Sequence, residues 1–412
     1  MRDVPAFPSP AIAPLEEHAR PDASEPWSNP MRPSGVNAIA SWAATTGLTE
    51  AARRSVAAML RAGVPVAIED YDYGAPREDQ RFPSILRSLP QGRRFDIDIY
   101  FLNVNELHVV PDDYLRARAR YIIGSWFWEL PSVARHDLGQ LDRVDEIWAA
   151  TEFVASTFRA RTSRPVTVLP CVVEPTPDPT FSRRNLGLPA SKFLFLYGYD
   201  ASFAIERKNP RAVIEAFELA FTADERREKV HLAMKTSHLA RLPEAHALVT
   251  AELARAGGTL IDEDLTDGEM AALTQQCDVY VSLHRAEGFG LGIAEAMYFG
   301  RPVVATAYSG NMDFMSNSNS CPVSYRMQSI SRTDLRLNPG SESVYIPGEL
   351  WAEPDVLEAA RRMRFLYEHP RFRQAVGDAG ARTIRERFSS LAVGRQMRER
   401  LEECTQRLTS PI

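Results

Sequence analysis

One stretch of the chain, residues 279–315, constrains the fold more than any other. Residues 279–283 form a short apolar run rich in β-branched and aromatic residues, which predicts a buried strand. A glycine-rich turn at 288–290 follows, then a helix over 291–299 closed by glycine and proline, and a second strand at 303–305. This order predicts a βαβ unit of a parallel sheet, with the glycine turn at the edge where ligands bind.

Two acids flank the glycine turn, Glu287 before it and Glu295 inside the helix, with seven residues between them. Glycines let a ligand approach the backbone, and free N–H groups at the helix start attract anions. A bare phosphate would be repelled by the carboxylates, whereas sugar hydroxyls donate to them. The pattern therefore predicts a ligand that is both phosphorylated and polyhydroxylated, namely a sugar nucleotide.

The motif that begins at His284, His-x-x-Glu-Gly-Phe-Gly-Leu, and ends in Ser309-Gly310 resembles a known family signature. It is similar to the Glu-x7-Glu motif of the retaining glycosyltransferases of family 4, and a thinner likeness covers residues 34–405. The resemblance implies an α/β architecture with the GT-B fold. In that fold two Rossmann-like, doubly wound domains face a cleft, and a C-terminal helix crosses back to the first domain.

The length of 412 residues exceeds what one hydrophobic core usually serves, which predicts two domains. Residues 1–33 hold eight prolines without apolar periodicity and are predicted to be a disordered leader. The rest divides into an N-terminal acceptor-side domain, a proline-rich linker, a C-terminal nucleotide-sugar-binding domain and the returning helix, over residues 34–175, 176–189, 190–385 and 386–412.

Composition narrows the function further. The net charge of −6 disfavours a nucleic-acid partner, and four widely spaced cysteines suggest neither a disulfide framework nor a zinc site. No apolar run has the length of a membrane span, so a cytoplasmic protein is expected. The stripe Arg116, Arg118 and Arg120 is typical of a solvated face; the alternatives are a phosphate-bearing acceptor or the inner face of the membrane. The oligomeric state is not predicted.

Three residues are predicted to face the acceptor. Gly47 lies in the loop after the first predicted strand, where the resemblance places a ligand-binding turn; relatives usually carry a second glycine at the position of Thr49. Trp126 and Glu129 follow the strand 121–123 and combine aromatic rings with an acid, as sugar-binding sites do. A similar Trp-x-Trp-Glu faces the cleft in a bacterial subgroup of the family. Core packing of the tryptophan is the alternative.

The resemblance assigns the donor diphosphate to Lys208, with Arg207 beside it, although the family's arginine usually stands where this chain has Ser202. Lys235 ends a later strand and either reaches the donor or is solvated. The predicted catalytic set is Glu287, Lys208 and Arg207. The predicted donor-binding residues are Gly288, Phe289, Gly290, Leu291, Glu295, Lys235, His284, Ser309 and Gly310.

No metal or other cofactor is expected, because Lys208, Arg207 and the N–H groups of the glycine turn would stabilise the leaving phosphate. Asp96 and Asp98 imitate the Asp-x-Asp metal motif of a different transferase fold, but a polar entry to the following apolar strand explains them better.

The predicted function is transfer of a hexosyl group, with retention, from a nucleotide sugar to a glycan or lipid-linked acceptor in bacterial polysaccharide biosynthesis. GDP-mannose is the first donor that the resemblance suggests. The departures at Ser202 and Thr49 leave open an inactive, sugar-nucleotide-binding subunit. An NAD-dependent oxidoreductase fits less well, because the glycines at 288, 290 and 292 do not follow the Gly-x-Gly-x-x-Gly spacing.

Overall fold

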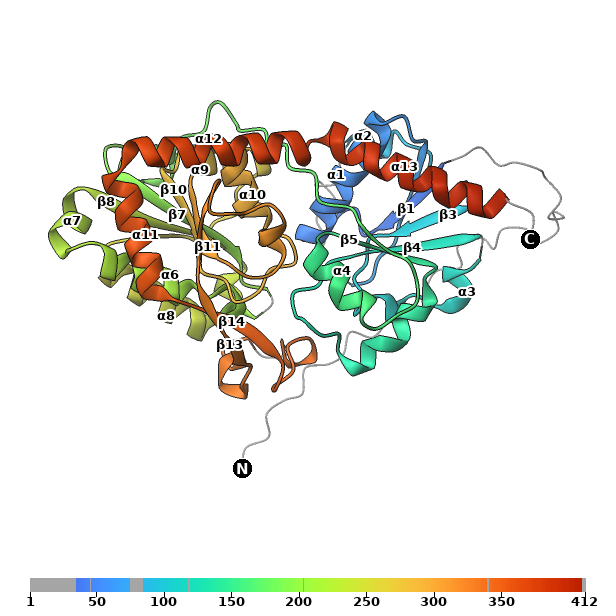
Figure 1. Cartoon of the computed structure of the whole chain (residues 1–412), viewed down its shortest axis with the longest axis horizontal. Coiled ribbons are helices and arrows are strands. Elements are labelled where there is room, and N and C mark those ends of the chain that lie inside the picture. Colours follow the sequence, from blue (N-terminus) through green and yellow to red (C-terminus); the bar gives the residue numbers. More distant parts are fainter. Residues whose placement is uncertain are drawn as a thin grey trace. The chain divides into compact units, whose positions relative to one another are not determined.

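Two parallel sheets with helices packed on both faces organise the computed structural model of the chain (Figure 1). We call each sheet with its helices a lobe, the first lobe being N-terminal. The structure describes residues 35–44, 46–74, 84–117, 119–202, 204–338 and 341–409. The predicted leader at 1–33 lies outside these residues.

The first sheet has the strand order β2-β1-β3-β4-β5-β6, and every pairing is parallel. Central strands buried on both faces need continuous apolar runs, and β1 is buried throughout. The strands are β1 (Val36–Ala40), β2 (Val66–Asp70), β3 (Ile97–Tyr100), β4 (Tyr121–Trp126), β5 (Glu146–Ala149) and β6 (Val166–Val168). The helices are α1 (Gly47–Arg61), α2 (Ser84–Arg87), α3 (Asp112–Leu115) and α4 (Glu152–Arg159).

The second sheet has the order β12-β11-β10-β7-β8-β9. The chain runs outward from β7 to β9, then returns to the other side of β7 with β10, so the strand order reverses between β7 and β10. Ligands bind doubly wound sheets in the crevice beyond the carboxyl ends at such a switch point. The strands are β7 (Phe193–Asp200), β8 (Val230–Ser237), β9 (Thr259–Ile261), β10 (Val279–Ser282), β11 (Val303–Thr306) and β12 (Cys321–Val323). The helices are α5 (Ile205–Lys208), α6 (Pro210–Ala220), α7 (Ala223–Glu228), α8 (Pro243–Arg255), α9 (Asp267–Gln276) and α10 (Leu291–Tyr298).

An antiparallel hairpin of β13 (Tyr325–Ser329) and β14 (Leu350–Pro354) follows the second sheet. Tyr345 and Trp351, from the hairpin and its loop, are buried in the same apolar cluster as Trp126 and Trp128 of the first lobe. This insertion therefore connects the second lobe to the core of the first.

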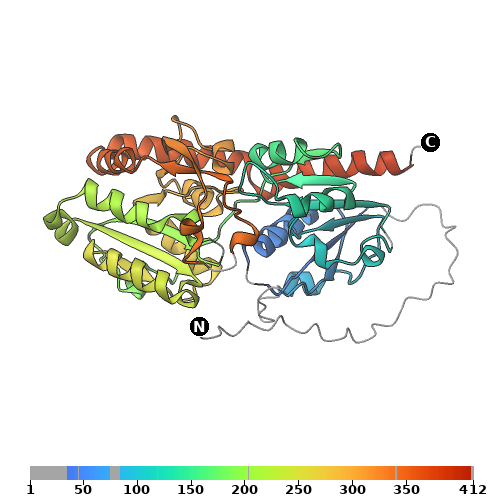
Figure 2. The same cartoon turned by 90° about the horizontal axis from the view of Figure 1, so that it is seen from below.

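The C-terminal helices α11 (Val356–Glu368) and α12 (Pro370–Arg387) belong to the second lobe, whereas α13 (Ser390–Thr409) lies beside the first sheet (Figure 2). A Cβ on Gly394 would lie 2.3 Å from the Ala58 carbonyl oxygen, so only glycine lets α13 approach α1 this closely. Arg400 binds the fully buried Glu146 of β5 through two 2.7 Å hydrogen bonds. The predicted returning helix is confirmed.

Asp98 is a structural residue of β3. It is fully buried, accepts a 2.6 Å hydrogen bond from Asn37 Nδ2 and lies 3.2 Å from Arg93 Nη1. Among the described residues, no group of three or more His, Cys, Asp or Glu side chains is placed to hold a metal ion.

The two outer arginines of the predicted stripe form ion pairs. Arg116 pairs with Asp145, and Arg120 pairs with Asp96. Arg118 lies outside the described residues. Within the part of the chain that the structure describes, helices lack the length and apolarity that crossing a membrane requires.

Candidate functional site

The glycine loop lies between β10 and α10, at the switch point of the second sheet. Gly290 has a φ of 92°, in the left-handed region that glycine enters without strain. The chain after β11 packs so tightly here that a Cβ on Gly310 would lie 2.1 Å from the Gly288 carbonyl oxygen. The Gly310 amide donates to the Glu287 carbonyl oxygen over 2.9 Å. The two glycines thereby fix the backbone that presents Glu287.

Glu287 directs its carboxylate toward two cations on α5, the short helix that follows β7. Lys208 forms an ion pair with one carboxylate oxygen, and Arg207 Nη1 lies 3.5 Å from the other. The backbone N–H of Glu287 donates to Ser309 Oγ over 2.8 Å, and this bond fixes the backbone of Glu287. Burial raises the pKa of Glu287, but the charges of Lys208 and Arg207 outweigh it and hold the pKa at about 2. Glu287 is therefore ionised at physiological pH.

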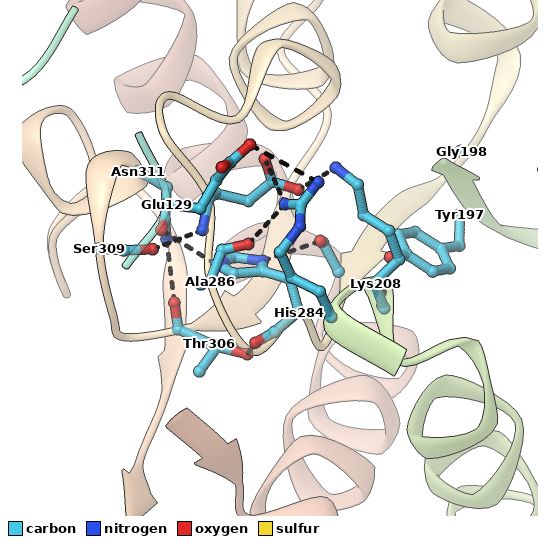
Figure 3. A network of polar contacts seen from close by, with 12 residues as sticks. Glu129, Tyr197, Gly198, Lys208, His284, Ala286, Thr306, Ser309 and Asn311 are labelled. Carbon is cyan, nitrogen blue, oxygen red and sulfur yellow. Dashed lines mark hydrogen bonds and ion pairs between the residues drawn. The ribbon is translucent and has the colours of Figure 1, made fainter. Parts of the chain in front are cut away.

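Arg207 is held from both lobes. Its side chain is almost fully buried, its Nη1 donates to the Ala286 carbonyl oxygen over 2.8 Å, and its Nη2 lies 3.7 Å from Glu129 of the first lobe. Figure 3 shows the polar network that contains Glu129, Ala286 and Lys208. The flanking residues Ala204 and Asn209 have φ of 45° and 53°, a conformation that costs about 1 kcal/mol per residue. This strained turn presents Arg207 and Lys208 together.

Glu295 lies inside α10, and its partner comes from the first lobe. Arg54 Nη1 of α1 lies 2.9 Å from the Glu295 carboxylate, and Arg54 Nε donates to Glu50 over 2.7 Å. Burial raises the pKa of Glu295 more than Arg54 lowers it, so the pKa stays above its ordinary value. The ionisation of Glu295 thus depends on contact between the lobes.

A cavity of about 730 Å³ opens in front of Glu287 and is lined by both lobes. Lys208 and the loop from Gly288 to Ile293 line it from the second lobe, and Gly47 and Glu129 line it from the first. The predicted donor-binding residues Phe289, Gly290 and Leu291 belong to this lining.

A second cavity, of about 770 Å³, is lined by Arg54 and Glu295. It shares Thr46, Gly47 and Leu291 with the first cavity. The two glutamates therefore face adjoining spaces, which together have room for an elongated ligand.

Four predicted donor-binding residues, His284, Lys235, Ser309 and Gly310, are absent from the cavity lining that the described residues form. His284 is fully buried, with Nδ1 3.0 Å from Ser282 Oγ and Nε2 3.1 Å from Asn311 Oδ1 (Figure 3). Burial lowers the pKa of His284, so the ring is neutral. Lys235 Nζ bonds the chain beside it, at the Thr236 carbonyl oxygen. Direct contact of these four residues with the donor stays a prediction.

The acceptor-side prediction needs one correction, at Trp126. Its side chain is fully buried in the first lobe, with its ring centre 5.3 Å from that of Phe158. Successive residues of an extended chain point to opposite sides, and the next residue, Phe127, lines the cavity instead. Glu129 lines the cavity, and its contact with the acceptor stays a prediction.

An additional polar group lies at the ends of β7 and β8. His238 Nδ1 is 2.9 Å from Asp200 Oδ1 and 2.8 Å from Ser202 Oγ, and all three residues line the cavity. The hydrogen bond to Asp200 raises the pKa of His238, which favours a positive charge there. Both partners contact the same ring nitrogen, whereas a Ser-His-Asp catalytic triad uses one nitrogen for each. The only sequence signal for this group is the unusual serine at position 202.

Residues 204–320 match the family model described as glycosyl transferases group 1. This segment holds Lys208, Glu287 and the whole glycine loop. A comparison with curated protein sequences finds no match.

Several solved structures are similar over nearly the whole chain. HepE from Anabaena, in complex with UDP and glucose, matches with a TM-score of 0.66 and 14% identity, covering 90% of this chain and 100% of that one. Sucrose-phosphate synthase from Thermosynechococcus elongatus matches with a TM-score of 0.63 and 15% identity, over 90% and 100% of the two chains. A glycosyltransferase from Rickettsia africae has a TM-score of 0.61 at 11% identity, over 90% and 99%.

These likenesses confirm the predicted GT-B fold, with its two Rossmann-like sheets. Together with the matched group 1 domain they support a glycosyltransferase of the GT-B type. The matched family also argues against the oxidoreductase alternative.

Proposed function

We propose that the protein is a retaining, metal-independent glycosyltransferase that moves a hexosyl group from a nucleotide sugar to a glycan or lipid-linked acceptor. The observation that carries the proposal is Glu287, held ionised between Lys208 and Arg207 beside a glycine loop, in a cavity lined by both lobes. Two structural neighbours support the donor class by their ligands. HepE was solved with UDP and glucose, and a pneumococcal O-GlcNAc transferase with UDP and GlcNAc.

The donor would lie along the second lobe. Its diphosphate fits the N–H groups at the start of α10 together with Lys208 and Arg207, because cations and a helix N-terminus both attract anions. The sugar hydroxyls would donate to Glu287, and the ribose hydroxyls to Glu295 in the adjoining cavity. The Arg54–Glu295 contact would then join the bound nucleotide to the first lobe.

In the reaction, the bond between the anomeric carbon and the β-phosphate oxygen breaks, and its electron pair stays on the phosphate. Lys208 and Arg207 stabilise that growing negative charge. The leaving phosphate oxygen accepts the proton of the acceptor hydroxyl, whose oxygen then bonds the anomeric carbon from the same face. The configuration is retained without a covalent enzyme intermediate.

The proposal also concerns the nucleotide base of the donor and the pathway in which the enzyme acts. The family resemblance favours GDP-mannose and bacterial polysaccharide biosynthesis, in the cytoplasm or at the inner face of the membrane. The ligands of the structural neighbours favour UDP-sugars.

A thermal-shift screen of UDP, GDP, ADP and their sugar derivatives separates these donors, because a ligand of the native state raises the melting temperature. The best donor then enters a transfer assay, and NMR of the product reports the anomeric configuration. Inversion would overturn the retaining mechanism. Nucleotide-sugar binding without transfer to any acceptor would favour the inactive subunit instead.

A further inference from the structure

The two walls of the cavity in front of Glu287 carry opposite charges. The second-lobe wall holds the basic residues Arg207, Lys208, Arg241 and His238, and its two acids, Glu287 and Asp200, are paired with them. The first-lobe wall holds Glu106 and Glu129, and no lysine or arginine occurs among the described residues that form it. The donor's diphosphate therefore has its cations on one side only.

The first-lobe wall also presents groups that suit a sugar. Phe127 is half-buried, lines the cavity and also packs against the apolar cluster that contains Phe289. Asn103 accepts the Phe127 amide hydrogen at Oδ1 over 2.8 Å, and its Nδ2 has no hydrogen-bond partner among the described residues. The backbone N–H of Asn103 donates a hydrogen bond to the Glu106 carboxylate over 2.8 Å. These bonds fix the Phe127 backbone, the Asn103 side chain and the Glu106 carboxyl relative to one another.

Each group recognises a different part of a carbohydrate. An aromatic face packs against the apolar C–H face of a sugar ring, and carboxylates accept hydrogen bonds from its hydroxyls. The free Asn103 amide nitrogen donates to a hydroxyl or ring oxygen. A phosphate at the same place would meet the charges of Glu106 and Glu129 without a counter-charge from this wall.

We propose that the first-lobe wall binds an uncharged sugar residue at the end of a glycan, and that it rejects an acceptor whose terminal sugar is phosphorylated. This inference rests on the proposed function, since the wall selects an acceptor only if the opposite wall binds a sugar nucleotide. A lipid-linked acceptor fits if its phosphates lie outside the cavity.

The test uses the full chain, the sugar nucleotide that gives the largest thermal shift, and a panel of methyl hexosides, each offered unmodified and as its 6-phosphate. We expect kcat/KM for the uncharged member of a pair to exceed that for the phosphorylated member at least tenfold. Glu106→Gln should lower transfer to the uncharged acceptor about tenfold and leave nucleotide affinity within twofold. Glu386→Gln, an exposed acid of α12, is the matched control.

The charge-reversed variant Glu106→Lys gives a readout that a general loss of activity would not imitate. In this variant, the ratio of kcat/KM for the uncharged acceptor to kcat/KM for the phosphorylated acceptor should fall toward one, whatever the absolute rates. Glu106 is a cleaner target than Glu129, which also lies 3.7 Å from Arg207.

The inference is overturned if the wild type uses the phosphorylated acceptors as well as or better than the uncharged ones. It is also overturned if Glu106→Lys leaves the kcat/KM ratio unchanged, or if the uncharged hexosides give no product. Failure of the proposed function gives a different result, because nucleotide binding and slow hydrolysis of the donor are measured without an acceptor. A protein that neither binds nor hydrolyses any sugar nucleotide refutes the proposed function itself.

Discussion

The regions around Glu287 and Glu295 stand at the two ends of one glycine loop, yet they hold their carboxylates differently. Glu287 has both cations from its own lobe, and its pKa is lowered to about 2. Glu295 has Arg54 from the other lobe, and its pKa is raised. A sequence motif presents the two acids as a symmetric pair, whereas only the first is held ionised within one lobe. On the proposed function, the region around Glu287 would serve the chemical step, and the charge of Glu295 would depend on contact between the lobes.

Replacing Glu287 should have the largest effect. Glu287→Gln keeps the shape but adds a donor where sugar hydroxyls need an acceptor, and it removes the counter-charge of Lys208 and one of the two acids beside Arg207. We expect kcat/KM for transfer to fall about 100- to 1,000-fold, as when one key polar group of an active site is lost. Steady-state kinetics of the folded variant measure this. A loss under tenfold would place Glu287 outside the reaction centre.

The pH dependence of stability should separate the two regions next. The pKa of Glu287 is lowered in the fold, so its ionised form stabilises the fold above pH 4.5, and this contribution is lost as the pH falls toward 2. Between pH 6 and pH 3 the stability advantage of the wild type over Glu287→Gln should shrink by about 2 kcal/mol. Glu295→Gln should show no such loss, because its pKa is raised. Denaturant unfolding at both pH values tests the contrast, which parallel behaviour of the two variants would contradict.

A smaller effect is expected at the contact between the lobes. Arg54→Met and Glu295→Gln should each weaken nucleoside diphosphate binding about tenfold, the value of one charged hydrogen bond. The double variant should be little weaker than either single one, since both remove the same contact. Calorimetric titration measures this, with Arg371→Met on the exposed face of α12 as the control. Additive losses would mean that the two residues act separately.

Chelation should have no effect. Because the leaving phosphate is assigned to Lys208 and Arg207, transfer should continue at its full rate in excess EDTA. Loss of activity that Mg²⁺ or Mn²⁺ restores would contradict this assignment and require a metal-binding role for the region around Glu287.

The sequence predicts best what depends on neighbouring residues. The βαβ unit at 279–315 follows from local apolar runs and glycines, and it occurs as predicted in β10, α10 and β11. Lys208 and Glu287 are 79 residues apart, so no local pattern joins them. The family resemblance assigned both to the donor, but it did not predict their ion pair. Arg54 was missed because its partner lies in the other lobe.

The error at Trp126 has a specific cause. The predicted strand ended at residue 123, whereas β4 continues to Trp126. Strand residues alternate between faces, so these three extra residues decide whether an aromatic side chain enters the core or the cavity. The hairpin of β13 and β14 was missed for a different reason. The side chains of β13 are mostly exposed, and apolar residues such as Tyr345 lie in irregular turns without a regular period.

The return of α13 to the first lobe has a consequence for how the chain matures on the ribosome. Val393, Met397 and Leu401 complete the core of a lobe whose first strand starts at Val36. Translation therefore delivers every residue of the second sheet before the first lobe can close its core. Until Arg400 is synthesised, Glu146 lacks the cation that it binds in the finished fold. The second lobe can therefore fold before the first. A nascent chain stalled before α13 would expose the incomplete apolar core of the first lobe to chaperones.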